Sequence, residues 1–172
     1  SATFELSQQG IGSDLNFLRS FLQYFQFTPI GDRTVLAAAV RLGLARTFED
    51  EELIPSERFF AGGATTVRGY REDDLGPRSI FGDAEGGRAM LILNAEARFP
   101  VYRWVRGVGF VDMGNVYPMV GDISFSDLLV GLGGGVRFDT PVGVIRFDLA
   151  VPANRRSFDP KWRVHFGLGH AF

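Results

Sequence analysis

The sequence of 172 residues has no cysteine, a single lysine and no long apolar run. Without cysteine there are no disulfides, no thiol nucleophile and no Cys-based metal site. No stretch approaches the roughly 18 to 20 uncharged apolar residues of a spanning helix, which argues against a helical membrane protein. The chain has 18 basic and 20 acidic side chains. It therefore has no net positive charge to attract nucleic acid, and we expect no nucleic-acid partner.

Phenylalanine and glycine are abundant instead, with 17 and 22 copies. This composition is unusual for an α/β enzyme and is typical of many short strands joined by turns. The length suits one domain, residues 1–172. Apolar and polar residues alternate with period two, which indicates strands. In the last segment one face carries Trp162, Val164, Phe166, Leu168, His170 and Phe172, and the other carries Arg163, His165, Gly167, Gly169 and Ala171.

The alternation predicts eight strands, near residues 2–8, 15–28, 33–46, 88–101, 105–117, 128–140, 143–152 and 162–172. Short connections at 28–33, 99–103 and 139–143 alternate with long ones at 47–87, 117–127 and 152–161. Short turns at one rim and long loops at the other are typical of transmembrane β-barrels. The fold class predicted is therefore all-β, an antiparallel transmembrane β-barrel. A soluble barrel or sandwich stays open as an alternative, because the period alone does not tell which face points inward.

Aromatic residues lie near several predicted strand ends, where they would form the girdles that barrels place at the two membrane interfaces. They are Tyr24, Tyr102, Trp104, Tyr117, Trp162 and Phe172.

The connection 47–87 carries the most informative segment, because residues 59–70 read F-F-A-G-G-A-T-T-V-R-G-Y. Gly62, Gly63 and Gly69 allow the backbone to reverse sharply, since glycine adopts positive φ without steric penalty. Arg68 stands at the tip of this segment. A guanidinium held away from bulk water needs an acidic partner.

Five segments carry a family likeness in the same order along the chain. They are the loop segment from Arg58 through Val67-Arg68-Gly69-Tyr70 to Pro77, then 94–100, 110–117, 133–141 and 166–172. Together they resemble the BamA/TamA superfamily of outer-membrane assembly factors. The likeness covers nearly all of the chain and matches the C-terminal half of a sixteen-stranded barrel. The family's N-terminal strands and its periplasmic POTRA repeats have no counterpart in this sequence.

The resemblance implies roles for individual residues. The functional, lumen-directed loop would consist of Gly62, Gly63, Val67, Arg68, Gly69 and Tyr70. Arg68 would bond two acids on the next strands, Glu96 and Asp112, and alternation places both acids on the inward side. Planar, bidentate pairing would fix the loop more firmly than a lysine could. Phe166, Gly167 and Phe172 would belong to the C-terminal signal that the assembly machinery reads.

Glycines recur on the inward face of the last strands, at Gly131, Gly133, Gly135, Gly167 and Gly169. They would either thin the wall so that the loop can lie against it, or let the strands bend and coil. Both interpretations stay open.

We expect no enzyme, no cofactor and no metal. His165 and His170 fall on opposite faces of one strand, so they cannot share an acid–base site. The sequence has no Gly-x-Ser-x-Gly elbow and no cluster with metal-ligand spacing. The acidic run Glu72, Asp73 and Asp74 could attract Ca²⁺, but an acidic loop is usually just solvated.

Size provides a further constraint. The interior of a closed eight-stranded barrel is filled by its own side chains, so a loop of about forty residues could not also enter it. If Arg68 reaches Glu96 and Asp112, the lumen must be wider than eight strands allow, and we infer that the chain forms half of a wall. A second copy or a separate N-terminal half would complete that wall. The alternative is a closed eight-stranded barrel with the loop outside.

Two functions follow from these expectations. The first is insertion or translocation of β-barrel or autotransporter proteins, in which the seam of the barrel templates an incoming strand by hydrogen-bond exchange. The second is a structural or adhesive barrel without assembly activity. The partners expected are outer-membrane lipids and unfolded outer-membrane clients. The expected location is the outer membrane of a Gram-negative bacterium, with an organellar outer membrane as the alternative.

Overall fold

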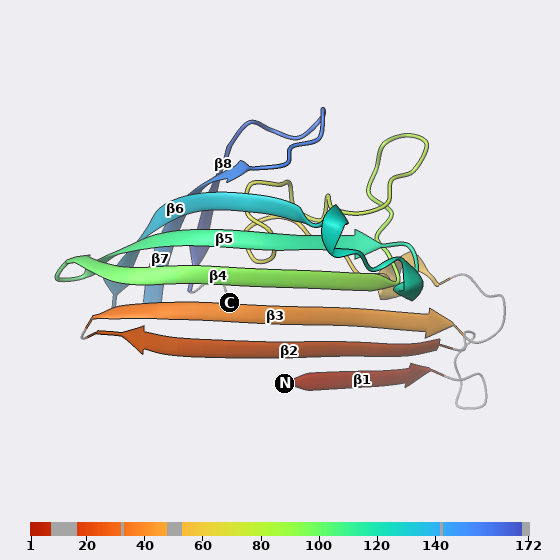
Figure 1. Cartoon of the computed structure of the whole chain (residues 1–172), viewed down its shortest axis with the longest axis horizontal. Helices are drawn as coiled ribbons and strands as arrows, with labels where there is room; N and C mark the ends of the chain where they lie inside the picture. Colours follow the sequence, from red (N-terminus) through yellow and green to blue (C-terminus); the bar gives the residue numbers. More distant parts are fainter. Residues whose placement is uncertain (8–16, 32, 48–52, 142, 170–172) are drawn as a thin grey trace.

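The computed structural model describes residues 1–7, 17–31, 33–47, 53–141 and 143–169. They form one antiparallel sheet in which each strand pairs with the next along the chain (Figure 1). The strands are β1 (Ala2–Ser7), β2 (Phe17–Ile30), β3 (Thr34–Thr47), β4 (Ala89–Tyr102), β5 (Val105–Tyr117), β6 (Leu129–Thr140), β7 (Gly143–Pro152) and β8 (Arg163–Leu168). All eight predicted strands are present. Within the described residues their ends differ from the predicted ones by at most two positions, except that β8 ends at Leu168.

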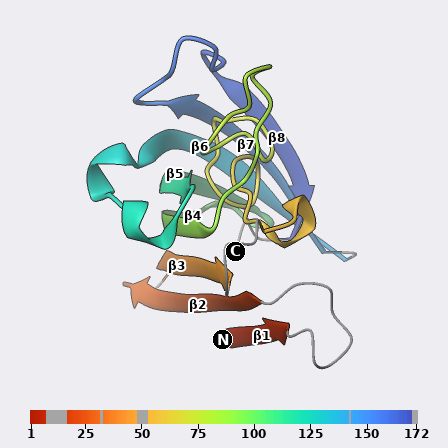
Figure 2. The ribbon, with the colours of Figure 1, turned by 90° about the vertical axis from the view of Figure 1, so that its right-hand side faces the viewer.

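The sheet curves into an open trough, and the long loop lies on its concave side (Figure 2). Each of β1 and β8 has a single neighbour within the described residues, so the sheet does not close on itself. The closed eight-stranded barrel with its loop outside is therefore wrong. The predicted partial wall, with the loop inside, is the arrangement found.

Connection lengths at the two rims differ as the sequence predicts. At one rim β2–β3, β4–β5 and β6–β7 are joined by short turns. At the other rim lie the long loop, here residues 53–88 with a 3-10 turn η2 (Pro55–Glu57), and the connections 118–128 and 153–162 (Figure 1). Connection 118–128 contains η3 (Val120–Asp122) and η4 (Phe125–Asp127). The helical segments of the described residues are three-residue 3-10 turns, and none of them could span a membrane.

The apolar side of the alternation faces outward and the charged side faces the trough. On β7 and β8 the outward Leu149, Phe166 and Leu168 are 52%, 62% and 73% exposed, whereas the inward Asp148 and His165 are buried. A soluble sandwich would show the opposite polarity. The pattern is that of a barrel wall with lipid outside and a polar interior.

The main apolar cluster forms between the loop and the trough near the long-loop rim. Loop residues Leu53, Phe59, Ala61, Val67, Tyr70 and Leu75 pack with strand residues Phe17, Ala45, Met90, Ile92, Val116 and Leu129. Since neither part would bury these side chains alone, the loop serves as the core of the open sheet.

A second cluster lies on the outer face, where connection 118–128 folds back over β3, β4 and β5. Ile123 and Leu128 pack with outward residues such as Leu91 and Tyr117. Tyr117 is 3% exposed and donates a hydrogen bond to the Ser124 carbonyl. Its predicted place in an interfacial girdle is therefore wrong, and so is that of Tyr24, which lies inside β2 rather than at its end. Tyr102, Trp104 and Trp162 are exposed at strand ends as predicted. Phe172 lies outside the described residues.

We expect that Leu149→Arg lowers the free energy of unfolding in lipid vesicles by about 2–4 kcal/mol, since it puts a charge on the lipid face of the wall. Phe125→Arg is the matched control, because Phe125 is 74% exposed but lies on a rim connection. Urea unfolding followed by tryptophan fluorescence measures both. Equal costs for the two variants would contradict the assignment of the lipid face.

Candidate functional site

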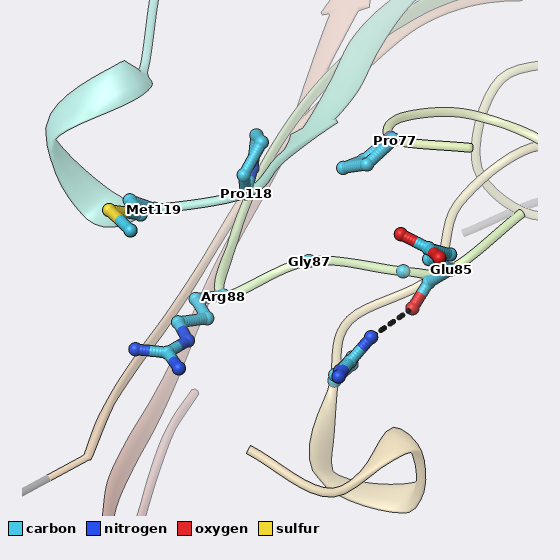
Figure 3. Close-up of a pocket in the computed structure, with 8 residues that line it drawn as sticks. Pro77, Glu85, Gly87, Arg88, Pro118 and Met119 are labelled. Atoms are coloured by element: carbon cyan, nitrogen blue, oxygen red, sulfur yellow. Dashed lines mark hydrogen bonds between the residues drawn. The ribbon is translucent and has the colours of Figure 1, made fainter. Parts of the chain in front are cut away.

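The loop leaves and rejoins the sheet through a narrow neck. Phe59 and Gly87 exchange two backbone hydrogen bonds of 2.8 and 3.0 Å. Arg58 donates to the Leu53 and Glu85 carbonyls, and Arg88 donates to Thr47 Oγ1. Arg58, Glu85, Gly87 and Arg88 border a pocket of about 200 Å³, which Pro118 and Met119 also line (Figure 3). The guanidiniums of Arg58 and Arg88 both donate to groups of the protein itself. The pocket therefore belongs to the attachment of the loop to the sheet.

Beyond the neck, the loop reverses at glycines in the left-handed region. Gly62 and Gly63 have φ of 117° and 89°, and Gly69 has φ of 99°, as the sequence predicts. A Cβ on Gly62 would overlap the Arg71 carbonyl, and one on Gly69 would lie 3.2 Å from the Pro152 nitrogen. Gly62 also exchanges hydrogen bonds with the Thr66 hydroxyl. Positive φ and close backbone approach both require glycine here.

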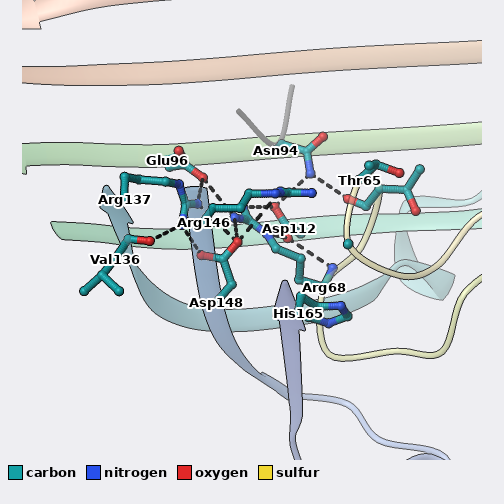
Figure 4. A network of polar contacts seen from close by, with 12 residues as sticks. Thr65, Arg68, Asn94, Glu96, Asp112, Val136, Arg137, Arg146, Asp148 and His165 are labelled. Atoms are coloured by element: carbon teal, nitrogen blue, oxygen red, sulfur yellow. Dashed lines mark hydrogen bonds and ion pairs between the residues drawn. The ribbon is translucent and has the colours of Figure 1, made fainter. Parts of the chain in front are cut away.

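Arg68 stands at the tip of the loop, against the trough wall (Figure 4). Its Nε and Nη2 donate to the two carboxylate oxygens of Asp112 at 2.7 and 3.0 Å, and its backbone N–H donates to Asp112 Oδ2 at 3.1 Å. Its Nη1 donates to Glu96 Oε2 at 2.9 Å. The Arg68 side chain is 1% exposed and both acids are fully buried. The structure thus brings together the three residues that the sequence paired, while their functional role stays a prediction.

Two further residues, Asp148 and Phe110, complete the surroundings of Arg68, and the sequence pattern did not predict them as part of the site. Asp148 on β7 accepts from Arg68 Nη1 at 3.3 Å and also pairs with Arg137. The Phe110 ring lies under the guanidinium, with 3.4 Å from Arg68 Cζ to the ring centroid. A cation stacked on an aromatic face and paired with three acids is held in a single orientation.

The carbonyls just before Arg68 are also bound by strand side chains. Arg41 on β3 donates to the Thr65 carbonyl at 2.8 Å. Asn94 on β4 donates to the Thr66 carbonyl at 2.7 Å and to Asp112 Oδ1 at 2.8 Å. Inward polar residues of three consecutive strands, β3 to β5, therefore position the tip.

After the tip, the loop is joined to the far wall of the trough. The Gly69 N–H donates to His165 Nε2 at 3.1 Å. Tyr70 is buried and donates to the Val130 carbonyl and Asn154 Oδ1. Burial, and next the nearby Asp159 carboxylate, raise the pKa of Tyr70 to about 12, so its hydroxyl stays a donor at neutral pH.

The buried polar groups of the trough carry an excess of positive charge. Five arginines (Arg41, Arg68, Arg98, Arg137 and Arg146) lie near three carboxylates (Glu96, Asp112 and Asp148). Arg146 is the least well paired of the groups drawn in Figure 4, since its nearest carboxylate oxygen is 3.8 Å away and its Nε and Nη1 make no hydrogen bond. The region around Arg146 is therefore unfavourable for any additional cation.

The inward glycines make room for the loop and for the groups that hold it. A Cβ on Gly131 would overlap the Arg68 carbonyl oxygen. One on Gly133 would overlap the Phe110 ring, and one on Gly135 would overlap Asp148 Oδ1. Of the two interpretations left open by the sequence, thinning of the wall for the loop applies to Gly131. At Gly133 and Gly135 a Cβ would also meet the Leu149 and Phe147 carbonyls of β7, so close approach of the strands requires glycine there as well. At Gly167 a Cβ would meet the Arg146 guanidinium instead, and at Gly169 it would meet open space.

A clamp outside the trough joins the long loop to connection 153–162. Arg156 donates to both carboxylate oxygens of Asp159 and to the Asp74 carbonyl. The Phe158 ring contacts the guanidiniums of Arg78 and Arg156, whose Cζ atoms lie 4.0 and 4.5 Å from the ring centroid. Burial alone would raise the pKa of Asp159, but the hydrogen bonds from Arg156 outweigh it and hold that pKa below its usual range.

Other predicted site residues lie elsewhere. Phe166 is 62% exposed on the outer face of β8, and Gly167 faces the trough. Phe172 and His170 lie outside the described residues. Glu72, in the acidic run, accepts from the Ala64 N–H. Within the described ranges, no group of three or more His, Asp or Glu side chains is arranged to hold a metal ion.

Among known protein families, the Omp85 superfamily domain matches residues 1–172. Among curated proteins, the chain is 28% identical over 173 residues to the outer membrane protein assembly factor BamA of Nitratidesulfovibrio vulgaris. It is 34% identical over 123 residues to outer envelope protein 80, chloroplastic, of Arabidopsis thaliana. These alignments cover 94% and 67% of this chain, but only 21% and 15% of the two relatives.

A solved structure shares the fold. The crystal structure of BamA from Haemophilus ducreyi lacking POTRA domains 1–3 matches with a TM-score of 0.78 at 20% identity. The match covers 89% of this chain and 35% of that chain. The open sheet with its internal loop therefore corresponds to part of a larger barrel.

We expect Gly131→Ala to destabilise the docked loop by about 1–3 kcal/mol, because the added methyl group displaces the Arg68 carbonyl in a packed region. Gly109→Ala is the matched control on the neighbouring strand, where a Cβ meets nothing within 4 Å. Unfolding in urea in lipid vesicles measures both. A loss for Gly131→Ala no larger than that for Gly109→Ala would show that the loop does not lie against β6.

Acid should loosen the outer clamp. Because folding lowers the pKa of Asp159, its contribution to stability is fully present above the unfolded pKa of about 3.9 and is lost as pH falls through the folded pKa. We expect amide exchange in residues 153–162 to speed up below about pH 4, beyond the intrinsic effect of pH. Asp159→Asn should remove this additional dependence. An Asn variant with the same acid response as the parent would assign the effect to other carboxylates.

Proposed function

Because the chain belongs to the Omp85 superfamily, we propose that it forms part of an outer-membrane barrel that assists the insertion or translocation of β-barrel or autotransporter proteins. The observation that carries this proposal is the buried pairing of Arg68 with Asp112 and Glu96 in the concave face of an open sheet. We assign the chain to the outer membrane of a Gram-negative bacterium. The likeness to a chloroplast outer envelope protein keeps an organellar membrane as the alternative.

The proposed mechanism is strand templating at the edge of the wall. An edge strand presents unpaired backbone donors and acceptors, which can pair with an incoming strand. β1 and β8 are such edges within the described residues. The Arg68 network would keep the wall in one shape while the edge exchanges hydrogen bonds. No covalent step is part of this mechanism, and the client's own folding would drive it.

Other strands must complete the wall for this mechanism to operate. Charged side chains line the concave side of the open sheet. If lipid filled that side, each of these ions would cost several kcal/mol. We propose that a separate N-terminal barrel half or a second copy of this chain supplies the missing strands. Outer-membrane lipids and unfolded outer-membrane proteins are the remaining partners in this proposal.

A structural or adhesive barrel is the second candidate. It would use the same apolar outer face and the same internal loop, and the long connections at one rim would be its binding surface. It differs from the first candidate in one measurable respect, which is that it would not change the folding of other proteins.

We expect vesicles that contain this chain to speed the folding of a urea-unfolded outer-membrane client, and Arg68→Ala to reduce the rate to that of empty vesicles. Removing Arg68 leaves three carboxylates without their shared cation, which disrupts the loop. Arg106→Ala is the control, because it removes a partly exposed pair with Asp139 at the short-turn rim, where an ion pair contributes little. Heat-modifiable mobility of the client on gels measures its folding.

The outcomes separate the two candidates. If the folded parent protein leaves client folding unchanged, assembly activity is rejected and the structural barrel is favoured. If Arg68→Ala and Arg106→Ala behave alike, the loop has no part in the activity. Chemical crosslinking in the same vesicles gives the mass of the assembly, and a single chain without partner strands would contradict the completed wall.

A further inference from the structure

We propose that His165 is a pH-sensitive latch, which holds the edge strand β8 against the Arg68 loop while its imidazole is neutral and releases the strand when it is protonated. The latch concerns contacts within this chain. It rests on the proposed function only where the freedom of β8 is linked to the templating of a client strand.

The hydrogen bond from Gly69 fixes the protonation state of His165. The Gly69 N–H donates to His165 Nε2 at 3.1 Å, and an imidazole nitrogen accepts a hydrogen bond only when it carries no proton. The side chain is 7% exposed, so water does not readily replace this partner. Among the described residues, this is the hydrogen bond that joins β8 directly to the loop.

Strand β8 has fewer partners than the inner strands, because it lies at the edge of the described sheet. Its backbone pairs with β7 alone, over Arg163 to Leu168. Its outward side chains Val164, Phe166 and Leu168 are exposed and touch no second layer of the protein. Edge strands with few buried contacts open at low free energy. The Gly69–His165 hydrogen bond therefore adds to the ladder with β7 a second, side-chain attachment of β8, on the trough side.

The charged groups around His165 are mostly cations. The groups that face it are Arg163 on its own strand, Asp148 and Arg146 on β7, and Arg68 in the loop. Figure 4 shows His165 beside Arg68 and below this network. Asp148, the one acid among them, is already shared by Arg68 and Arg137.

Protonation of His165 would therefore have two effects, and both would weaken its contact with the loop. It would replace the acceptor at Nε2 with a donor that faces the Gly69 N–H, and it would add a cation to a region that already has excess positive charge. Both effects separate the imidazole from the loop. The backbone groups of β8 then become free to exchange partners, so acid would favour an open edge.

The test is amide hydrogen exchange by NMR, on the whole chain in detergent micelles, between about pH 8 and about pH 5, the range that brackets an unperturbed histidine pKa. Protection factors are used, because they remove the intrinsic effect of pH. We expect protection of the Gly69 amide and of the β8 amides to fall roughly tenfold in acid. His165→Gln provides an acceptor oxygen that does not titrate, so its protection factors should stay constant. His165→Ala should show low protection throughout.

A parallel loss of protection in the parent protein and in His165→Gln would overturn the proposal, since other groups would then cause the acid effect. If the Gln variant does not fold, a chemical-shift titration of the parent protein tests the latch instead. The chemical shift of the Gly69 amide proton must then follow the His165 ring protons with one midpoint, while that of the Gly31 amide in the β2–β3 turn does not. Different midpoints for Gly69 and His165 would reject the latch. Neither measurement uses a client, so failure of the client-folding experiment leaves this test intact.

Discussion

The buried guanidinium of Arg68 is the constraint on which the rest of the structure depends. A positive charge with no contact to water requires carboxylates around it, and Asp112, Glu96 and Asp148 meet that requirement from three different strands. Their inward direction fixes the phase of each strand, because a shift of one residue would turn every side chain to the other face. The apolar residues must then face outward, where lipid is the solvent that suits them.

The shape of the wall follows from the same constraint. The backbone of the loop tip can lie directly against β6 because this strand carries glycine at three successive inward positions, Gly131, Gly133 and Gly135. These glycines leave space for the Arg68 carbonyl, the Phe110 ring and the Asp148 carboxylate. Glycine in a strand interior is unfavourable for the strand itself, and here the packing of the loop offsets that cost. The wall is thin because the loop replaces the side chains that would fill a closed barrel.

Much of this could be predicted from the sequence, for a physical reason. Period-two alternation gives strand phase, so the inward positions of Glu96 and Asp112 follow directly, and the positive φ of Gly62 and Gly69 follows from the turn chemistry of glycine. The same alternation places Asp148 and His165 inward, but it carries no information on how strongly the sheet curves. Only curvature brings β7 and β8 within reach of a loop tip that also contacts β4 and β5. The prediction that Tyr117 belongs to an interfacial girdle is wrong for a related reason. The local sequence pattern does not indicate that connection 118–128 folds over the outer face and buries this side chain.

A double-mutant cycle between Arg68 and Asp112 tests the account most directly. The free energies of unfolding of the parent protein, Arg68→Ala, Asp112→Ala and the double variant are measured by urea unfolding in lipid vesicles. A shared, water-excluded bidentate pair predicts a coupling free energy of about 3 kcal/mol. A coupling within about 0.5 kcal/mol of zero would contradict the account, because that is the value of a solvated surface pair.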